Sequence, residues 1–130
     1  MRVLALDFGA ARTGVAISDA TGTIARPLGV VERAAASDGL ARVQQIVREH
    51  SAELVVVGLP LTLRGEHGSQ AEATEEFVRS LRGALDVPVE TYDERFTTAL
   101  AVQAGGTAPE DARAAAHLLE SYLGQLGEAG

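Results

Sequence analysis

The run Leu54-Val-Val-Val-Gly58 constrains the fold more than any other segment of the chain. A short run of β-branched residues predicts a strand that is buried on both faces, as in a parallel sheet covered by helices. Amphipathic helices are predicted on either side of it, over Ser37–His50 and from Ser69 to about Leu85, each opened by a serine cap. A further strand is expected at Val87–Asp93. Strands that alternate with helices indicate parallel pairing through right-handed crossovers.

The first third of the chain predicts antiparallel pairing instead. Strands are expected within Arg2–Gly9, at Gly14–Ser18 and within Ile24–Glu32, where Pro27 disfavours a regular centre. Asp19-Ala-Thr-Gly22 has the composition of a tight turn. These strands should therefore form a meander.

The C-terminal quarter is predicted to be helical. A short helix begins at Thr97 or Thr98, and a last helix runs from the capping box Thr107–Glu110 to about Leu123. The element order predicts an α/β fold with a mixed five-stranded sheet, an antiparallel meander followed by parallel strands, and helices on both faces. The 130 residues suffice for one domain, expected over 1–123, with a frayed tail over 124–130.

Composition bounds the environment of the protein and its charge. The chain has no cysteine, which excludes disulfides and thiolate chemistry. Neither a signal peptide nor an apolar run long enough to cross a bilayer is visible, so we expect a cytoplasmic protein without membrane contact. The net charge is −7, and all 11 basic residues are arginine. This balance disfavours nonspecific nucleic-acid binding, so any contacts with phosphate must come from a local arginine patch.

Two acidic residues stand out by their position. Asp7 is the only charge in the first apolar run, where it either ends a strand at a turn or binds a metal. Asp111 lies in the first turn of the last predicted helix, where the helix dipole favours any acid. The residues 4, 7, 8 and 11 positions after it are Ala115, Leu118, Leu119 and Tyr122. These apolar residues place Asp111 on the stripe that faces the sheet, so its carboxylate needs a partner there.

A third acidic segment, Tyr92-Asp-Glu-Arg95, closes the strand that starts near Val87. Asp93 and Glu94 point to opposite faces if the strand continues, and alternation alone leaves open which of them joins Asp7 and Asp111. Arg95 either pairs with one of these acids or binds phosphate. Three carboxylates at one sheet edge suit Mg²⁺ or Mn²⁺, and two such ions about 4 Å apart can promote cleavage of a phosphodiester bond.

Several segments resemble the YqgF/RuvX family. The opening Leu4–Asp19 matches that family's first signature. Further matches follow in family order at Val56–Leu61, Gly65, Gly68–Ala71, Tyr92–Thr98, Asp111 and the helix from Ala114 to Leu123. These bacterial RNase H-like proteins are described as similar to Holliday junction resolvases and as candidate pre-16S rRNA nucleases. The resemblance implies an RNase H-like nuclease domain.

The same resemblance implies the site residues. Asp7, the Asp93–Glu94 pair and Asp111 would form the catalytic centre, with Asp7, Glu94 and Asp111 as the ligands of two Mg²⁺ or Mn²⁺ ions. Residues expected to contact nucleic acid are Arg12, Arg64 in the loop Leu61–Gly68, which we expect to move over a bound strand, and Arg95. The sequence departs from the family pattern in two places, with Ala11 where a lysine is common and no basic residue in Gly105–Asp111.

Three functions follow as expectations. The first is a metal-dependent nuclease that processes the 5′ end of pre-16S rRNA and leaves 5′-phosphate and 3′-hydroxyl ends. The second is a Holliday junction resolvase, for which a homodimer would supply two active sites. The third is a ribosome-assembly factor that binds nucleic acid with little activity, which the net charge of −7 favours and the retained carboxylates oppose.

Overall fold

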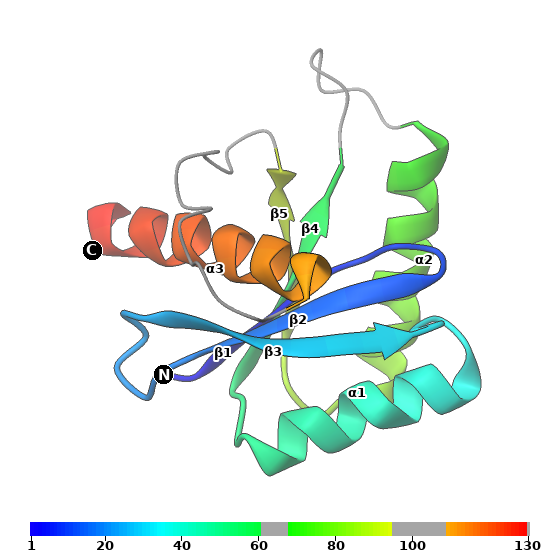
Figure 1. The fold of residues 1–130 in the computed structure, drawn as a ribbon, viewed down its shortest axis with the longest axis horizontal. Helices are drawn as coiled ribbons and strands as arrows, with labels where there is room; N and C mark the ends of the chain where they lie inside the picture. Colours follow the sequence, from blue (N-terminus) through cyan, green and yellow to red (C-terminus); the bar gives the residue numbers. More distant parts are fainter. Residues whose placement is uncertain (61–67, 95–108, 130) are drawn as a thin grey trace.

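The computed structural model describes residues 1–60, 68–94 and 109–129 and shows a five-stranded sheet with helices on both faces (Figure 1). The spatial order of the strands is β3-β2-β1-β4-β5. Strands β1 to β3 pair antiparallel, whereas β4 pairs parallel to both β1 and β5. The α/β class and the mixed sheet expected from the sequence are confirmed.

The meander consists of β1 (Val3–Asp7), β2 (Arg12–Ser18) and β3 (Ala25–Glu32). Contrary to the expectation for Pro27, β3 continues through it, and Pro27 pairs with Ala16 beside a register shift in β2. A proline is tolerated here because β3 is an edge strand with no neighbour on its outer side among the described elements.

The parallel half follows the predicted alternation of helices and strands. It comprises α1 (Ser37–Glu49), β4 (Leu54–Leu59), α2 (Ser69–Ala84) and β5 (Val89–Asp93). The predicted serine caps are wrong, because Ala36 and Gly68 occupy the N-cap positions and neither helix has a side-chain cap. Each serine lies one residue too late, already inside its helix. The short helix expected from Thr97 or Thr98 lies outside the described residues.

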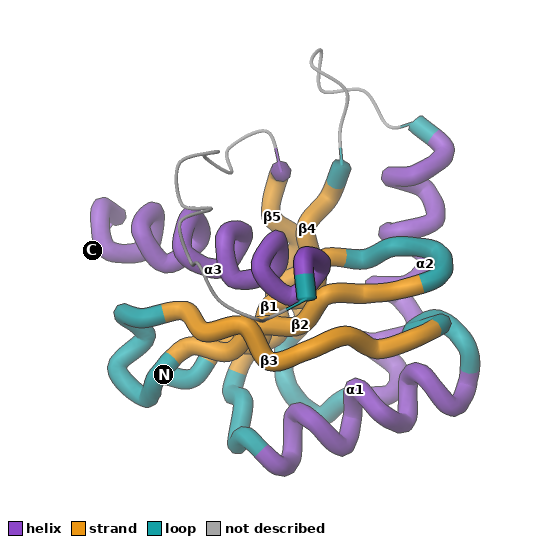
Figure 2. Tube along the Cα trace, viewed as in Figure 1, coloured by secondary structure: helices purple, strands orange, loops and turns teal. Residues whose placement is uncertain are grey.

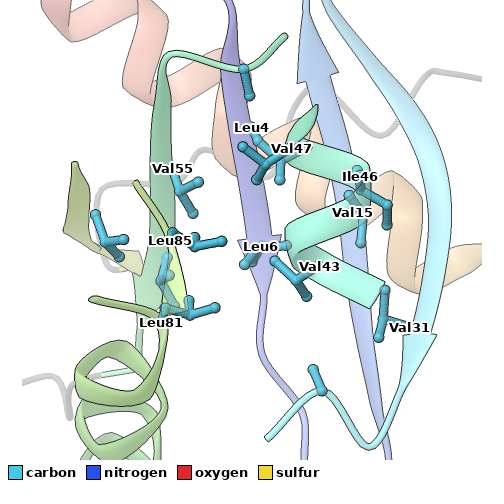
Figure 3. Packing of buried hydrophobic residues seen from close by; sticks show 14 of the residues in the cluster. Leu4, Leu6, Val15, Val31, Val43, Ile46, Val47, Val55, Leu81 and Leu85 are labelled. Carbon is cyan, nitrogen blue, oxygen red and sulfur yellow. The ribbon is translucent and has the colours of Figure 1, made fainter. Parts of the chain in front are cut away.

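Helices α1 and α2 cover one face of the sheet. The core on this face joins side chains of the sheet such as Leu4, Leu6 and Val55 to Val43 of α1 and Leu81 of α2 (Figure 3). Successive residues of a strand point to opposite faces, so the alternate residues Val3, Ala5 and Val56 contact α3 instead. The continuous apolar run of β4 is thus buried on both sides.

The last helix, α3 (Glu110–Ala129), crosses the opposite face of the sheet, as Figure 2 shows. The sequence placed its end near Leu123, yet it continues six residues further. Gly124 and Gly127 weaken a helix by about 1 kcal/mol each, but strong helix formers lie between and after them.

Under the helix, the rings of Tyr92 and Tyr122 meet edge to face with centroids 5.7 Å apart, and the Tyr122 hydroxyl donates to Glu90 Oε1 at 2.8 Å.

Within the three described ranges, no helix has both the length and the apolar character of a membrane-spanning segment.

Candidate active site

Asp7 is the last residue of β1, and its side chain lies on the α3 face of the sheet. Two residues earlier on the same face, Ala5 is fully buried against α3. Asp7 pairs across the strands with Gly14 of β2. The carboxylate is therefore at the point where the central strand leaves the core, next to a residue without a side chain.

Gly14 brings Asp111 to the same place. A Cβ atom at Gly14 would overlap the backbone carbonyl of Asp111, so β2 and the first turn of α3 touch through their main chains. Ala115, Leu118, Leu119 and Tyr122 are all buried against the sheet, as their spacing predicts. The prediction that Asp111 heads the sheet-facing stripe of α3 is consistent with this contact.

The structure brings Glu94, rather than Asp93, to Asp7. Tyr92 is buried under α3, and Glu94, two residues later, lies on that same face. The Glu94 carboxyl group lies over Gly58 of β4, where a Cβ atom would overlap its Oε1. From there it forms a hydrogen bond with the side chain of Asp7. Asp93 contributes charge nearby, because its carboxylate is one of the groups that raise the pKa of Glu94.

The three acids Asp7, Glu94 and Asp111 are here called the carboxylate site, and the pKa values of Asp7 and Glu94 are raised in it. Burial raises the pKa of Asp7, and the negative charge of Asp111 raises it further, while the hydrogen bond from Glu94 acts in the opposite direction. Burial, the hydrogen bond to Asp7 and the charges of Asp7 and Asp93 together raise the pKa of Glu94 to about 8. At neutral pH the pair therefore holds one proton, which Glu94 donates to Asp7.

Arg12 lies beside Asp111 of the carboxylate site. Its Nε atom is 3.4 Å from Asp111 Oδ2, and its side chain is 68% exposed. Arg64 and Arg95, the other two arginines expected to contact nucleic acid, lie outside the described residues.

The chemistry of the carboxylate site fits a hard divalent cation. All its donors are carboxylate oxygens, and among the described residues neither Asp7 nor Glu94 forms an ion pair with a basic side chain. A half-buried pair of acids that keeps a proton because no positive charge neutralises it is suited to exchange that proton for a metal ion. In the part of the chain that the structure describes, no three ligand side chains already surround a common point. Asp111 faces Arg12, and Glu94 is bonded to Asp7.

Sequence reasoning missed the two glycines on which this arrangement depends. Gly14 admits the main chain of Asp111, and Gly58 admits the side chain of Glu94. A signal for Gly58 was present, because a glycine that interrupts a β-branched strand often marks a close approach by another group.

Comparison with known proteins shows the family of this chain. A family model described as "RuvX: Holliday junction resolvase" matches residues 1–125. A relative from Chloroflexus aurantiacus is 48% identical over 101 residues, which cover 78% of this chain and 66% of the relative. A second, from Moorella thermoacetica, is 37% identical over 142 residues, covering 100% of this chain and 99% of the relative. Both carry the name "Putative pre-16S rRNA nuclease". The chain thus spans slightly less than two thirds of the first relative.

A solved structure shares the fold. RuvC of T. thermophilus, determined in complex with a Holliday junction substrate, superposes with a TM-score of 0.66 at 19% sequence identity. The superposition covers 98% of this chain and 96% of that one. At this level of identity the similarity establishes the fold alone.

Proposed function

Because the chain belongs to the RuvX family, we propose that it is a divalent-metal-dependent nuclease that processes the 5′ end of pre-16S rRNA in the cytoplasm. Its relatives' name as pre-16S rRNA nucleases supports this choice of substrate. The catalytic centre is the carboxylate site, with Asp7, Glu94 and Asp111 as metal ligands and Asp93 beside them. Arg12, Arg64 and Arg95 contact the nucleic acid.

The proposal depends above all on the hydrogen-bonded pair of Asp7 and Glu94 next to Asp111. These side chains come from three distant segments of the chain and gather at the end of the central strand. Buried carboxyl groups that repel one another destabilise a fold, so a cluster of this kind is usually kept for function.

Each residue of the site has a defined task in hydrolysis. Mg²⁺ or Mn²⁺, when bound, supplies a coordinated water of lowered pKa and stabilises negative charge on the leaving oxygen. Asp7 and Glu94, once their shared proton is lost, would hold the cation, and Asp111, which lies beside Arg12, would be the third ligand. Arg12 is then available to hold a phosphate oxygen with its planar guanidinium group. Cleavage in this manner leaves 5′-phosphate and 3′-hydroxyl ends.

A second candidate function is resolution of Holliday junctions, which the description of the matching family model favours. Symmetric cleavage of a four-way junction requires two active sites at a fixed separation, and a homodimer of this chain would supply them.

The test offers both substrates, a precursor fragment of 16S rRNA and a four-way DNA junction, to the wild-type protein and to Asp7→Asn, first with Mg²⁺ and then with Mn²⁺. We expect the wild type to shorten the RNA at its 5′ end and Asp7→Asn to lose this activity while remaining folded. Asp86→Asn, which neutralises an exposed acid just before β5, is the matched control and should cut like the wild type.

Three other results would overturn parts of the proposal. Cleavage of the junction alone would assign the resolvase function. Binding of RNA without cleavage, under either metal, would indicate an assembly factor. Full activity of Asp7→Asn would remove Asp7 from the site.

A further inference from the structure

A hollow of about 270 Å³ lies between helix α2 and the end of the sheet formed by β4 and β5. We call it the α2–β5 hollow. Two of the residues that line it are apolar and four are polar or charged: Leu59, Glu75, Val78, Arg79, Arg82 and Thr91.

The two arginines of the hollow are positioned to bind an anion. Arg82 donates from Nε and Nη2 to the carbonyl oxygen of Val89, at 3.1 and 2.8 Å, which fixes its guanidinium plane. Within the described ranges its other N–H groups have no hydrogen-bond partner. Arg79 lies one helical turn earlier, on the same side of α2, and is exposed. Among the residues that the structure describes, neither arginine forms an ion pair with a carboxylate. With Glu75, the lining has a net charge of +1 (two positive, one negative), in a chain whose net charge is −7.

The hollow is also close to the carboxylate site along the chain, although it opens on the other face of the sheet. Leu59 directly follows Gly58, the residue on which the Glu94 carboxyl group lies, and Leu59 pairs with Asp93. Strand β5 is the outermost strand among the described elements, so the two features lie on opposite faces of the same outer part of the sheet. Helix α2 begins near the end of β4 (Figure 1), and side chains on a helix lean toward its N-terminus. Arg79 therefore leans toward the sheet edge that carries the acids, whereas Arg82 is held at Val89, the first residue of β5.

From these observations we propose that the α2–β5 hollow is a second phosphate-binding site, which holds a phosphodiester group of the same nucleic acid away from the bond that is cut. The substrate strand then passes around the outer edge of β5. A volume of about 270 Å³ is just below the usual range for small-molecule pockets, roughly 300 to 1,000 Å³, and suits a phosphate with its sugar. Contacts with phosphate carry no sequence information, so this site contributes affinity and register rather than base specificity.

The inference rests on the proposed function, and its test separates the two. Binding is measured in the Asp7→Asn background, which prevents cleavage, with Mg²⁺ present and over a range of salt concentrations. Two RNA lengths serve as probes, about 4 and about 16 nucleotides, so that only the longer one spans both sites. The variant is Arg79→Gln, because Arg79 makes no hydrogen bond to the fold among the described residues, unlike Arg82. Arg48→Gln, at an exposed arginine in the last turn of α1, is the control with the same change in charge.

We expect Arg79→Gln to weaken binding of the longer RNA severalfold and to make the dependence of log K on log[salt] shallower by about 0.7, the value for one contact with a single strand. Binding of the shorter RNA should be unchanged, and Arg48→Gln should match its parent with both probes. If Arg79→Gln and Arg48→Gln bind the longer RNA equally, the hollow is not a phosphate site, whether it is unused or receives an acidic protein partner. If the parent protein binds neither RNA nor DNA, the proposed function itself fails, and the inference fails with it.

Discussion

A single proton held between Asp7 and Glu94 links the chemistry of the site to the stability of the fold. Glu94 has an ordinary pKa of 4.5, and its environment in the folded protein raises this to about 8. Without a metal, the folded state keeps a proton that the unfolded chain would release. The dependence of stability on pH therefore tests the site without a substrate.

We predict that the metal-free protein loses stability as the pH rises from about 4.5 to about 8. In this window the folded state binds more protons than the unfolded state, so the free energy of unfolding decreases with pH. Glu94→Gln removes the titrating group and should flatten the curve. Urea denaturation in EDTA at several pH values measures both proteins. A variant whose curve parallels that of the wild type would show that Glu94 does not hold the proton.

Asp111→Ala distinguishes a metal ligand from an acid that merely serves the helix dipole. In EDTA the loss should be small, about 0.3–1 kcal/mol, because the ion pair with Arg12 is largely exposed and Glu110 remains at the helix start. With Mn²⁺ or Mg²⁺, the variant should lack the rise in Tm that the wild type shows, since a ligand stabilises only the state that binds it.

Glu110→Ala is the matched control for this substitution, because it removes a neighbouring exposed acid from the same helical turn. It should keep the metal-induced rise in Tm. Equal gains for Asp111→Ala and the wild type would make Asp111 a capping acid and reduce the site to two carboxylates.

At the scale of elements, the site depends on how closely α3 approaches β2. Gly14 is the point of contact, and a side chain there would meet the main chain of Asp111, which has no freedom to rotate away. The helix that carries Asp111 can therefore pack this close to the sheet only because residue 14 has no side chain.

We predict that Gly14→Ala destabilises the protein by about 1–3 kcal/mol or more and abolishes metal binding, because α3 must shift away from the sheet. Gly29→Ala is the control, as a Cβ atom on that neighbouring strand has nothing within 4 Å. Its stability should change by less than about 1 kcal/mol. Urea denaturation and metal titration of both variants provide the comparison, and equal stabilities would refute the close contact.

The sequence predicts elements well where burial governs them. The run that became β4 and the apolar stripe behind Asp111 were recognisable because tertiary burial imposes a regular period on them. Helix ends were predicted less well. Ser37 and Ser69 resemble caps, but the chain enters each helix one residue earlier, and Gly124 does not stop α3 because good helix formers follow it.

The choice between Asp93 and Glu94 depended on information that the sequence does not contain. Alternation assigns a face to each residue only if the end of β5 is known, and that end is fixed by pairing with β4. The role of Gly58, which leaves room for the Glu94 side chain, likewise depends on which strand lies beside Glu94. Local pattern can place residues on elements, whereas contacts between distant elements decide which of them meet.

For the molecule as a whole, the charge distribution sets how binding depends on salt. The chain has a net charge of −7, so the field around it repels nucleic acid at long range, and attraction must come from single arginines. Those we assign to binding are few: Arg12, Arg64, Arg79, Arg82 and Arg95.

We predict that log K for nucleic acid falls with log[salt] with a slope no steeper than about −4.5, which corresponds to five phosphate contacts on a duplex. Fluorescence anisotropy with the Asp7→Asn protein at increasing KCl concentrations measures this slope. A steeper dependence would mean that arginines outside this group also bind phosphate.

The contact between Tyr92 and Tyr122 has an optical consequence. The chain has no tryptophan and only these two tyrosines, so its near-ultraviolet absorbance and its emission come almost entirely from one pair of rings between β5 and α3. Any event that lifts or tilts the helix carrying Asp111 changes the surroundings of both rings at once. The molecule therefore contains its own spectroscopic probe of that helix, and near-ultraviolet circular dichroism can follow the docking of α3 in the unlabelled protein.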